Sequence, residues 1–159
     1  MVTAALDLDL QPLDGDARPL GEWLTTFPLV PVILDPFTHE SAWLLDTAKR
    51  ILEHFRDAGC RTCWILTCSA DDAKRFLGPY ADEILTFADE DRAISTSLGV
   101  EQVPAILLLR QDGQVTAKAE GWDPDTWRGV TEAVAEMSSW SRPVVPAAGD
   151  PVPFGGTPL

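Results

Sequence analysis

The stretch that most constrains the fold is residues 31–45, P-V-I-L-D-P-F-T-H-E-S-A-W-L-L. Its apolar run, Val32–Leu34, is typical of a buried parallel strand, and the turn at Asp35–Thr38 leads directly into a helix. In α/β proteins, ligands bind beyond the carboxyl ends of such strands, where the first turns of helices present unpaired N–H groups. The stretch therefore predicts an α/β fold with its candidate site at residues 35–38, the elbow, beside Ser41.

Length and charge narrow the class of protein. The 159 residues carry a net charge of −13 and are 45% hydrophobic, which is enough for one globular domain with a real core. Nucleic-acid binding is not expected, because phosphate contacts need a basic face and acidic residues occur in every segment. The opening M-V-T-A-A-L-D-L-D-L has no basic region and no long apolar run, so we expect no signal peptide, no membrane insertion and a cytoplasmic location.

The chain has three cysteines and two histidines. An odd number of cysteines without an export signal is typical of reduced thiols. His39 and His54 lie 15 residues apart with no cysteine at metal-site spacing, so no metal site is predicted. We expect neither a metal nor another cofactor.

Hydrophobic periodicity and turn signals give the order of elements along the chain. The apolar stripe after the elbow predicts one helix that ends before Gly59, and Asp112-Gly113 predicts a hairpin. The expected strands are Ala5–Leu10, Trp64–Thr67, Glu83–Phe87, Val103–Leu109 and Gln114–Glu120; the other expected helices are Leu20–Leu24, one beginning at Ser69, Asp91–Leu98, and one beginning at Asp123-Pro124 that buries Trp127, Val130, Val134 and Met137.

From Trp140 the composition changes. Residues 140–159 contain five prolines and show no periodicity, so they predict an extended tail. We divide the chain into a folded domain, residues 1–139, and a Pro-rich tail, residues 140–159. The tail either lies over the domain or is offered to a partner.

This order of elements resembles that of the thioredoxin superfamily, and within it the TlpA and peroxiredoxin-like branch. The resemblance implies a thioredoxin-like fold, a central mixed β-sheet flanked by helices. It also implies that Pro104 is cis and that the backbone of Val103 pairs with an extended substrate chain. The resemblance covers residues 1 to about 139 and rests on Leu20–Trp23, on V-I-L-D-P-F-T-H-E-S at 32–41, on the extra helix and strand between Asp71 and Phe87, and on Gly99-Val100 followed by Val103-Pro104.

The elbow departs from the family where the family's chemistry lies. Alignment on the central strand places the nucleophilic cysteine on Ser41 and the resolving cysteine on Leu44, so C-x-x-C has become S-A-W-L. Serine lacks the acidity and the redox couple of a thiol, and leucine cannot resolve a mixed disulfide. Thr38 has the spacing of the peroxiredoxin T-x-x-C motif, which has no peroxidatic function without its cysteine. We therefore expect no catalytic residue here, and Ser41 is most simply a polar residue that caps the helix.

Two other places carry thiols. Cys60 and Cys63 have C-x-x-C spacing, but they follow a helix C-terminus and precede a strand, which predicts a position at the opposite end of the sheet from Pro104. Cys68 follows the carboxyl end of its strand, so it could approach Ser41 or Pro104. Burial as a small apolar residue is the alternative for Cys68.

The resemblance therefore implies a groove at the elbow that has no thiols. We expect this groove to hold an extended polypeptide by strand-like pairing. Trp43 is either an exposed anchor for that chain or a residue packed under the N-terminal segment. The expected groove residues are Phe37, Thr38, Ser41, Trp43, Val103 and Pro104.

The leading hypothesis is a redox-inactive protein that binds a partner polypeptide. Short similarities to the hydrogenase-expression accessory proteins, at Trp23–Thr25, Asp35-Pro36 and Pro124–Trp127, imply an assembly factor that binds an extended segment of a redox-enzyme subunit. The alternative is a thiol-disulfide oxidoreductase or peroxidase that uses Cys68 or the Cys60/Cys63 pair. A third interpretation is a structural subunit whose tail lies on a larger complex.

Overall fold

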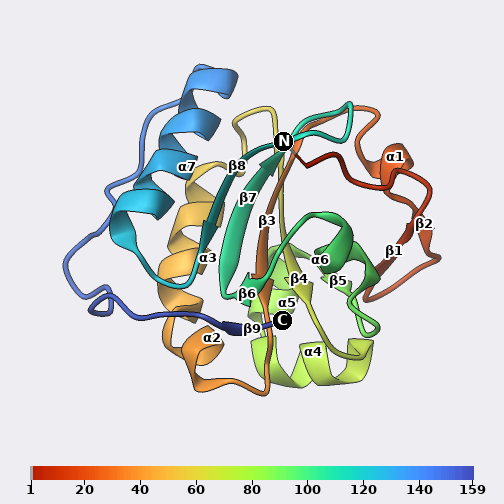
Figure 1. The fold of residues 1–159 in the computed structure, drawn as a ribbon, viewed down its shortest axis with the longest axis horizontal. Helices are drawn as coiled ribbons and strands as arrows, with labels where there is room; N and C mark the ends of the chain where they lie inside the picture. Colours follow the sequence, from red (N-terminus) through yellow and green to blue (C-terminus); the bar gives the residue numbers. More distant parts are fainter. Residues whose placement is uncertain (1) are drawn as a thin grey trace.

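The computed structural model describes residues 2–159, and a mixed sheet runs through its centre (Figure 1). The strand order is β2-β1-β5-β4-β3-β7-β8, and β6 pairs separately with β9. The strands are β1 (Asp9–Pro12), β2 (Arg18–Pro19), β3 (Leu29–Leu34), β4 (Arg61–Leu66), β5 (Leu85–Ala88), β6 (Gln102–Val103), β7 (Ala105–Leu109), β8 (Val115–Glu120) and β9 (Thr157–Pro158). The helices are α1 (Leu20–Trp23), α2 (His39–Trp43), α3 (Leu45–His54), α4 (Ala70–Leu77), α5 (Tyr80–Glu83), α6 (Ala93–Ser97) and α7 (Pro124–Ser138).

The central strand is β3, and it determines where the elbow lies. It runs parallel to β4 and antiparallel to β7, and all six of its residues are buried. A strand buried on both faces needs apolar side chains on both, which L-V-P-V-I-L supplies. The predicted fold class, a mixed sheet flanked by helices, is confirmed.

Two hydrophobic cores lie on the two faces of the sheet. One packs α3 and α7 against β3, β4 and β7, and the other packs α1, α6 and the N-terminal segment against the opposite face (Figure 1). Alternate residues of β4 show the division, because Trp64 lies in the first core and Ile65 in the second. Both faces are therefore covered, which leaves the ends of the strands as the open positions.

Several local features predicted from the sequence are present in the structure. Ser69 caps α4 by accepting the Asp72 N–H at 3.2 Å, and Asp123 caps α7 with Pro124 at its first position. The hairpin at Gly113 joins β7 to an antiparallel β8. Local signals of this kind depend on neighbouring residues alone.

Three expectations were wrong. The N-terminal strand is Asp9–Pro12 instead of Ala5–Leu10, because β1 pairs with the short β5 through Gln11 and Pro12. The helix after the elbow breaks at Leu44 and ends at His54. Met137 is 40% exposed, since its position on α7 turns away from the sheet.

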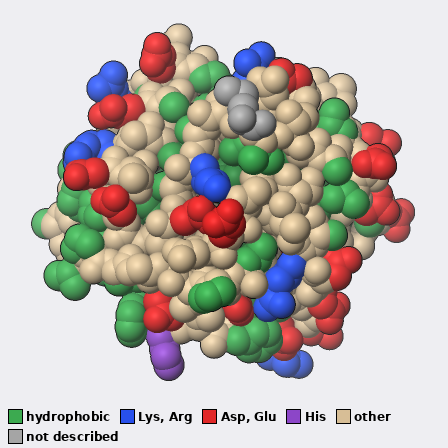
Figure 2. Space-filling view, in the orientation of Figure 1, with side chains coloured by type: hydrophobic (Ala, Val, Ile, Leu, Met, Phe, Trp, Pro, Cys, Tyr) green, Lys and Arg blue, Asp and Glu red, His purple; other side chains and the backbone are tan. Residues whose placement is uncertain are grey.

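The surface agrees with the acidic composition. Figure 2 shows acidic side chains spread around one face of the molecule, with fewer basic side chains among them. Among residues 2–159, no helix is both long and apolar enough to cross a membrane.

Candidate functional site

Asp35 closes the elbow. Its carboxylate accepts the Phe37 N–H at 2.9 Å, while its carbonyl accepts the Thr38 N–H and hydroxyl at 3.1 and 2.9 Å. These bonds form because the chain must turn within four residues between the buried end of β3 and the start of α2. Thr38 is the N-cap residue of α2, although its side chain bonds to the turn and not to the helix.

Ser41 lies inside this hydrogen-bonded turn. Its side chain is fully buried, and its Oγ accepts the Asp35 N–H at 3.0 Å and is hydrogen-bonded to the Thr38 hydroxyl at 3.1 Å. Neither partner is a base that could take the hydroxyl proton in a nucleophilic attack. Ser41 therefore stabilises the elbow from within α2 and does not occupy the capping position.

Leu44 occupies the other aligned cysteine position and is a core residue. It is fully buried in the core under α3 and α7 and forms the joint between α2 and α3. A side chain in that core cannot meet a disulfide on a bound chain. The two positions that carry thiols in the resembling family are thus both closed to solvent.

The second part of the site is the segment that enters β7. The Val103–Pro104 peptide bond is cis, Val103 is fully buried, and β6 lies directly before it. Along β6 runs β9, antiparallel, with Val103 opposite Thr157 and Gln102 opposite Pro158. An extended chain therefore lies at the backbone edge beside Pro104, and this chain is Thr157–Pro158 of the protein's own tail.

Glu120 fixes the backbone of β6. Its carboxylate accepts the Glu101 and Gln102 N–H groups at 2.6 and 2.7 Å and pairs with Lys118 at 3.2 Å. Burial alone would raise the pKa of Glu120, but these donors and the Lys118 charge outweigh it and lower the pKa. Glu120 thus holds the strand in place from the end of β8.

The tail follows the surface from α7 to β6. Trp140 donates its indole N–H to the His54 carbonyl, Val145 is buried in the first core, and Asp150 is bound by Thr47 and Arg50. Figure 1 shows it passing outside α7 and α3 before it reaches α2 and β6. Of the two courses predicted for the tail, the structure has the one in which it lies over the domain.

Trp43 is an exposed aromatic beside this tail. It is 57% exposed, and its ring meets the ring of Phe154 edge to face at 5.5 Å. Phe37 is 72% exposed and lies on the elbow. The structure thus brings Trp43, Val103 and Pro104 to the tail, whereas Thr38 and Ser41 lie within the turn.

Sequence reasoning missed Glu120, Trp122 and Phe154. Trp122 and Phe154 bond to each other through their backbones, with the two N–H···O distances 2.8 and 3.0 Å. The available signal was the pair Gly155-Gly156 beside an aromatic residue, because adjacent glycines permit close approach of two backbones. That signal stood in a segment without periodicity, so no partner could be assigned to it.

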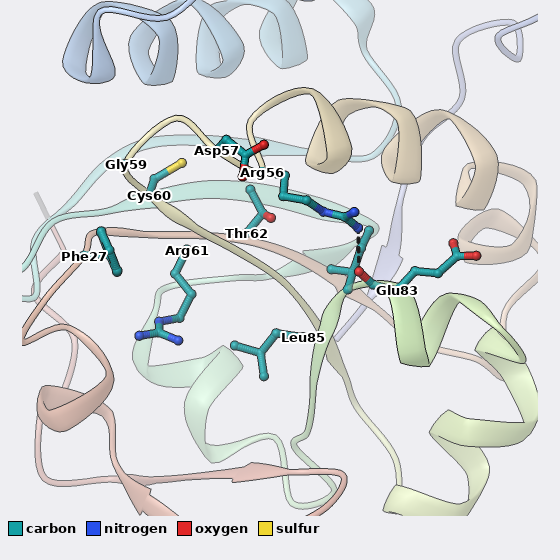
Figure 3. Close-up of a pocket in the computed structure, with 10 residues that line it drawn as sticks. Phe27, Arg56, Asp57, Gly59, Cys60, Arg61, Thr62, Glu83 and Leu85 are labelled. Carbon is teal, nitrogen blue, oxygen red and sulfur yellow. Dashed lines mark hydrogen bonds between the residues drawn. The ribbon is translucent and has the colours of Figure 1, made fainter.

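Cys60 and Cys63 lie at the other end of the sheet and on opposite faces of it. Cys60 is 6% exposed in the first core, at the rim of a pocket of about 490 Å³ that Arg56 and Arg61 also line (Figure 3). Cys63 is fully buried in the second core. Burial raises the pKa of Cys60 to about 11 and raises that of Cys63 further. The pair has the spacing of a redox motif without its geometry.

Cys68 is on the elbow side, as predicted, and is 3% exposed. Its thiol donates to the Ser69 carbonyl at 3.3 Å. Burial and the nearby carboxylates of Asp72, Asp35 and Glu90 raise its pKa to about 12. Since the thiolate is the nucleophile, a raised pKa lowers the fraction of this thiol in its reactive form at neutral pH. The six-residue β4 separates it from Cys60 by roughly 20 Å.

The fold was compared with known proteins. No protein-family model and no curated protein matches the sequence. Peroxiredoxin Q of Xanthomonas campestris superposes with a TM-score of 0.66 at 17% identity, over 87% of this chain and 96% of its own. A secreted Mycobacterium tuberculosis disulfide oxidoreductase gives a TM-score of 0.59 at 19% identity, over 80% and 96%.

A hypothetical protein of Sinorhizobium meliloti superposes over 99% of this chain and 93% of its own, with a TM-score of 0.68 at 11% identity. Identities this low carry the fold and leave the activity open. The chain therefore has the thioredoxin-like fold, and its structural neighbours include DsbE-type disulfide oxidoreductases and peroxiredoxins.

Proposed function

We propose that this protein is a redox-inactive member of the thioredoxin-like fold that binds an extended segment of a partner polypeptide at β6, beside Pro104. The observation that carries the proposal is the pairing of an extended chain, β9, with Gln102 and Val103. A backbone edge that accepts one extended segment supplies main-chain hydrogen bonds to any other segment of compatible shape.

The absence of thiol chemistry is the second part of the proposal. Its support is the burial of Ser41 and Leu44 and the raised pKa values of the Cys60 and Cys68 thiols. A thiol-disulfide oxidoreductase or peroxidase that uses one of the three cysteines is the competing function, and the structural neighbours named above are of that class.

A redox assay separates these two functions. Insulin reduction and peroxide consumption are measured for the wild type and for Cys60→Ser, Cys63→Ser and Cys68→Ser. We expect no turnover above the buffer rate in any of them. Turnover by the wild type that disappears in one variant would establish the competing function and identify its thiol.

A binding assay tests the groove itself. Peptides selected from a displayed random library on the immobilised protein are titrated into labelled protein and followed by NMR. We expect shifts at the amides of Gln102 and Val103 and at the Trp43 indole, with none at Arg56 or Arg61 in the distant pocket. Selected peptides that shift only the distant pocket would contradict the proposal.

The narrower form of the proposal is that the partner is a subunit of a redox enzyme under assembly. It rests on the short similarities to the hydrogenase accessory proteins. Its test is the titration repeated with synthetic segments of such a subunit beside scrambled versions, with binding of the authentic segments alone expected. Equal binding of the scrambled versions would contradict it.

A further inference from the structure

The strand β9, beside Pro104, is held by hydrogen bonds to residues 101–103. Beyond the β6–β9 pairing, the Leu159 N–H donates to the Glu101 carbonyl at 3.0 Å, and the Thr157 hydroxyl donates to the Val103 carbonyl at 3.4 Å. Upstream, Phe154 exchanges two backbone bonds with Trp122. These contacts on both sides of the glycine pair align residues 154–159 along β6 and Trp122.

The tail divides at Asp150 into two parts that are held differently. Before this residue the tail is anchored, because the Asp150 carboxylate accepts from the Thr47 hydroxyl, from Arg50 and from the Ala147 N–H. After it, residues 151–159 carry no charged side chain; the Pro151 carbonyl accepts the Trp122 indole N–H at 2.8 Å, the remaining residues are held by the backbone bonds described above, and Val152 is 82% exposed. Residues 151–159 are thus held by neutral hydrogen bonds and packing alone, whereas the anchor at Asp150 includes an ion pair with Arg50.

The close approach of the tail to β6 leaves little room for a side chain at Gly156. A methyl group there would lie 3.0 Å from the Val103 carbonyl oxygen and 3.2 Å from the Gly121 nitrogen. A methyl group on Gly121, whose φ is +70°, would in turn lie 2.8 Å from the Gly156 nitrogen. A methyl group on the adjacent Gly155 would meet open space. Gly155 and Gly156 are therefore a matched pair for an experiment, because a side chain would meet close neighbours only at Gly156.

The aromatic contact adds a second requirement. Phe154 places its ring edge to face against Trp43, an arrangement favoured by the charge distribution of aromatic rings. Without Phe154, more of the already exposed Trp43 ring would face water. The occupant is therefore specified by an aromatic residue followed, two positions later, by glycine, and then by a residue with backbone groups free to pair with Val103.

We propose that Pro151–Leu159 is a built-in ligand of the groove, and that the partner is a polypeptide whose extended segment carries the same aromatic-x-Gly-x-Pro pattern and must displace it. This inference rests on the proposed function and names the partner's chemistry. A tethered ligand competes at a high effective concentration. The apparent affinity of a partner is therefore its intrinsic affinity multiplied by the fraction of molecules in which the tail has left its place. The tail thereby sets the partner concentration that is needed for binding.

The test uses the full chain with a matched pair of variants, Gly156→Val and Gly155→Val. The probe is a fluorescent peptide of residues 150–159, and binding is read by anisotropy. We expect the peptide to bind Gly156→Val at least roughly tenfold more tightly than it binds the wild type or Gly155→Val, because only the first substitution frees the groove. A peptide that itself carries Gly156→Val should not bind any of the three.

Equal binding of the peptide to both variants would overturn the inference, as would the failure of the peptide to bind a folded Gly156→Val protein. In that second case the library-selected peptides are added to the same variant. If they bind, the groove is a binding site and the tail is not its model ligand. If they do not bind, the proposed function fails as well.

A measurement on the wild type avoids the question of whether Gly156→Val folds. Hydrogen exchange of the Leu159 amide, which bonds to Glu101, is compared with that of amides in β3 and β4. We expect the Leu159 amide to exchange by local opening, at least a hundredfold faster than the core amides. Exchange at the rate of global unfolding would mean that the tail is never released and would overturn the inference.

Discussion

The two ends of the central strands differ in what they hold: an extended chain at one end and a pair of cysteines at the other. At the elbow end, β6 pairs with an extended chain, and the side chains of Ser41 and Leu44 are fully buried. At the other end, Cys60 and Cys63 have C-x-x-C spacing but lie on opposite faces of the sheet, with Cys60 at the rim of a pocket. The comparison teaches that a motif has meaning through its place in the fold, since the same two cysteines after β3 would make a different protein.

The largest expected effect lies at the elbow end, at the aligned resolving position. Leu44→Ala should lower the free energy of unfolding by about 3 kcal/mol, because a fully buried leucine leaves a cavity. Urea unfolding measures the change. The half-buried Leu45 is the control, and its alanine variant should lose about 1 kcal/mol. A loss below about 1 kcal/mol at Leu44 would mean that this position is not part of the core.

The anchor of the tail gives the next effect. Asp150→Ala should cost about 2 kcal/mol, because Arg50 and Thr47 lose a partly buried partner. The exposed pair of Asp14 with Lys74 is the control, and Asp14→Ala should change stability by less than about 0.5 kcal/mol. Thermal unfolding at two salt concentrations distinguishes the two pairs, and equal losses would show that the anchor is a surface contact.

Thiol reactivity compares the two ends directly. With pKa values of about 11 for Cys60 and about 12 for Cys68, Cys60 should carry roughly tenfold more thiolate at any pH well below 11. Alkylation by iodoacetamide between pH 8 and 10, followed by mass spectrometry, should therefore modify Cys60 first. Faster modification of Cys68 would reveal an activated thiol at the elbow and favour the peroxidase function.

The same raised pKa values predict the direction of an alkaline effect. The folded state holds these protons more tightly than the unfolded state, whose thiols titrate near 9.0. The contribution of these two thiols to the free energy of unfolding is therefore fully present below pH 9. It is lost as pH rises towards 11 and 12. Denaturant midpoints measured across this range should fall less steeply in Cys68→Ser than in the wild type. Parallel curves would show that the Cys68 thiol is accessible in the folded state.

The smallest effect concerns the exposed contact of the groove. Trp43→Ala should cost about 1 kcal/mol or less, since the ring is 57% exposed and its recorded aromatic contacts are Phe154 and His39. Its signature is local, a faster hydrogen exchange of the Trp122 and Leu159 amides with unchanged exchange in β3. Phe37→Ala is the control at a 72% exposed position on the same elbow. Equally faster hydrogen exchange in both variants would argue against a specific contact between Phe154 and Trp43.

The sequence was sufficient where the determining forces are local. The buried β3, the cap at Ser69, the start of α7 at Asp123 and the hairpin at Gly113 all follow from neighbouring residues. The fold class followed from their order.

The parts that could not be predicted depend on distant partners. The alternation at Ala5–Leu10 is real, but β5 pairs with Gln11 and Pro12 and so determines which residues form β1. The break at Leu44 follows from seating α3 on the core. The two-residue β9 has a proline at one of its positions and exists because β6 lies beside it. Glu120 was missed for the same reason, because its partners, the amides of Glu101 and Gln102, lie on a different segment of the chain.

The pairing of β9 with β6 also has a consequence for handling the protein. An uncovered strand edge is a template for pairing with other molecules, and such edges promote aggregation. Whatever displaces the last nine residues without replacing them, including a bulky tag fused after Leu159, would leave that edge open. The concentration at which released-tail variants stay monomeric is therefore a property to determine before their binding is measured.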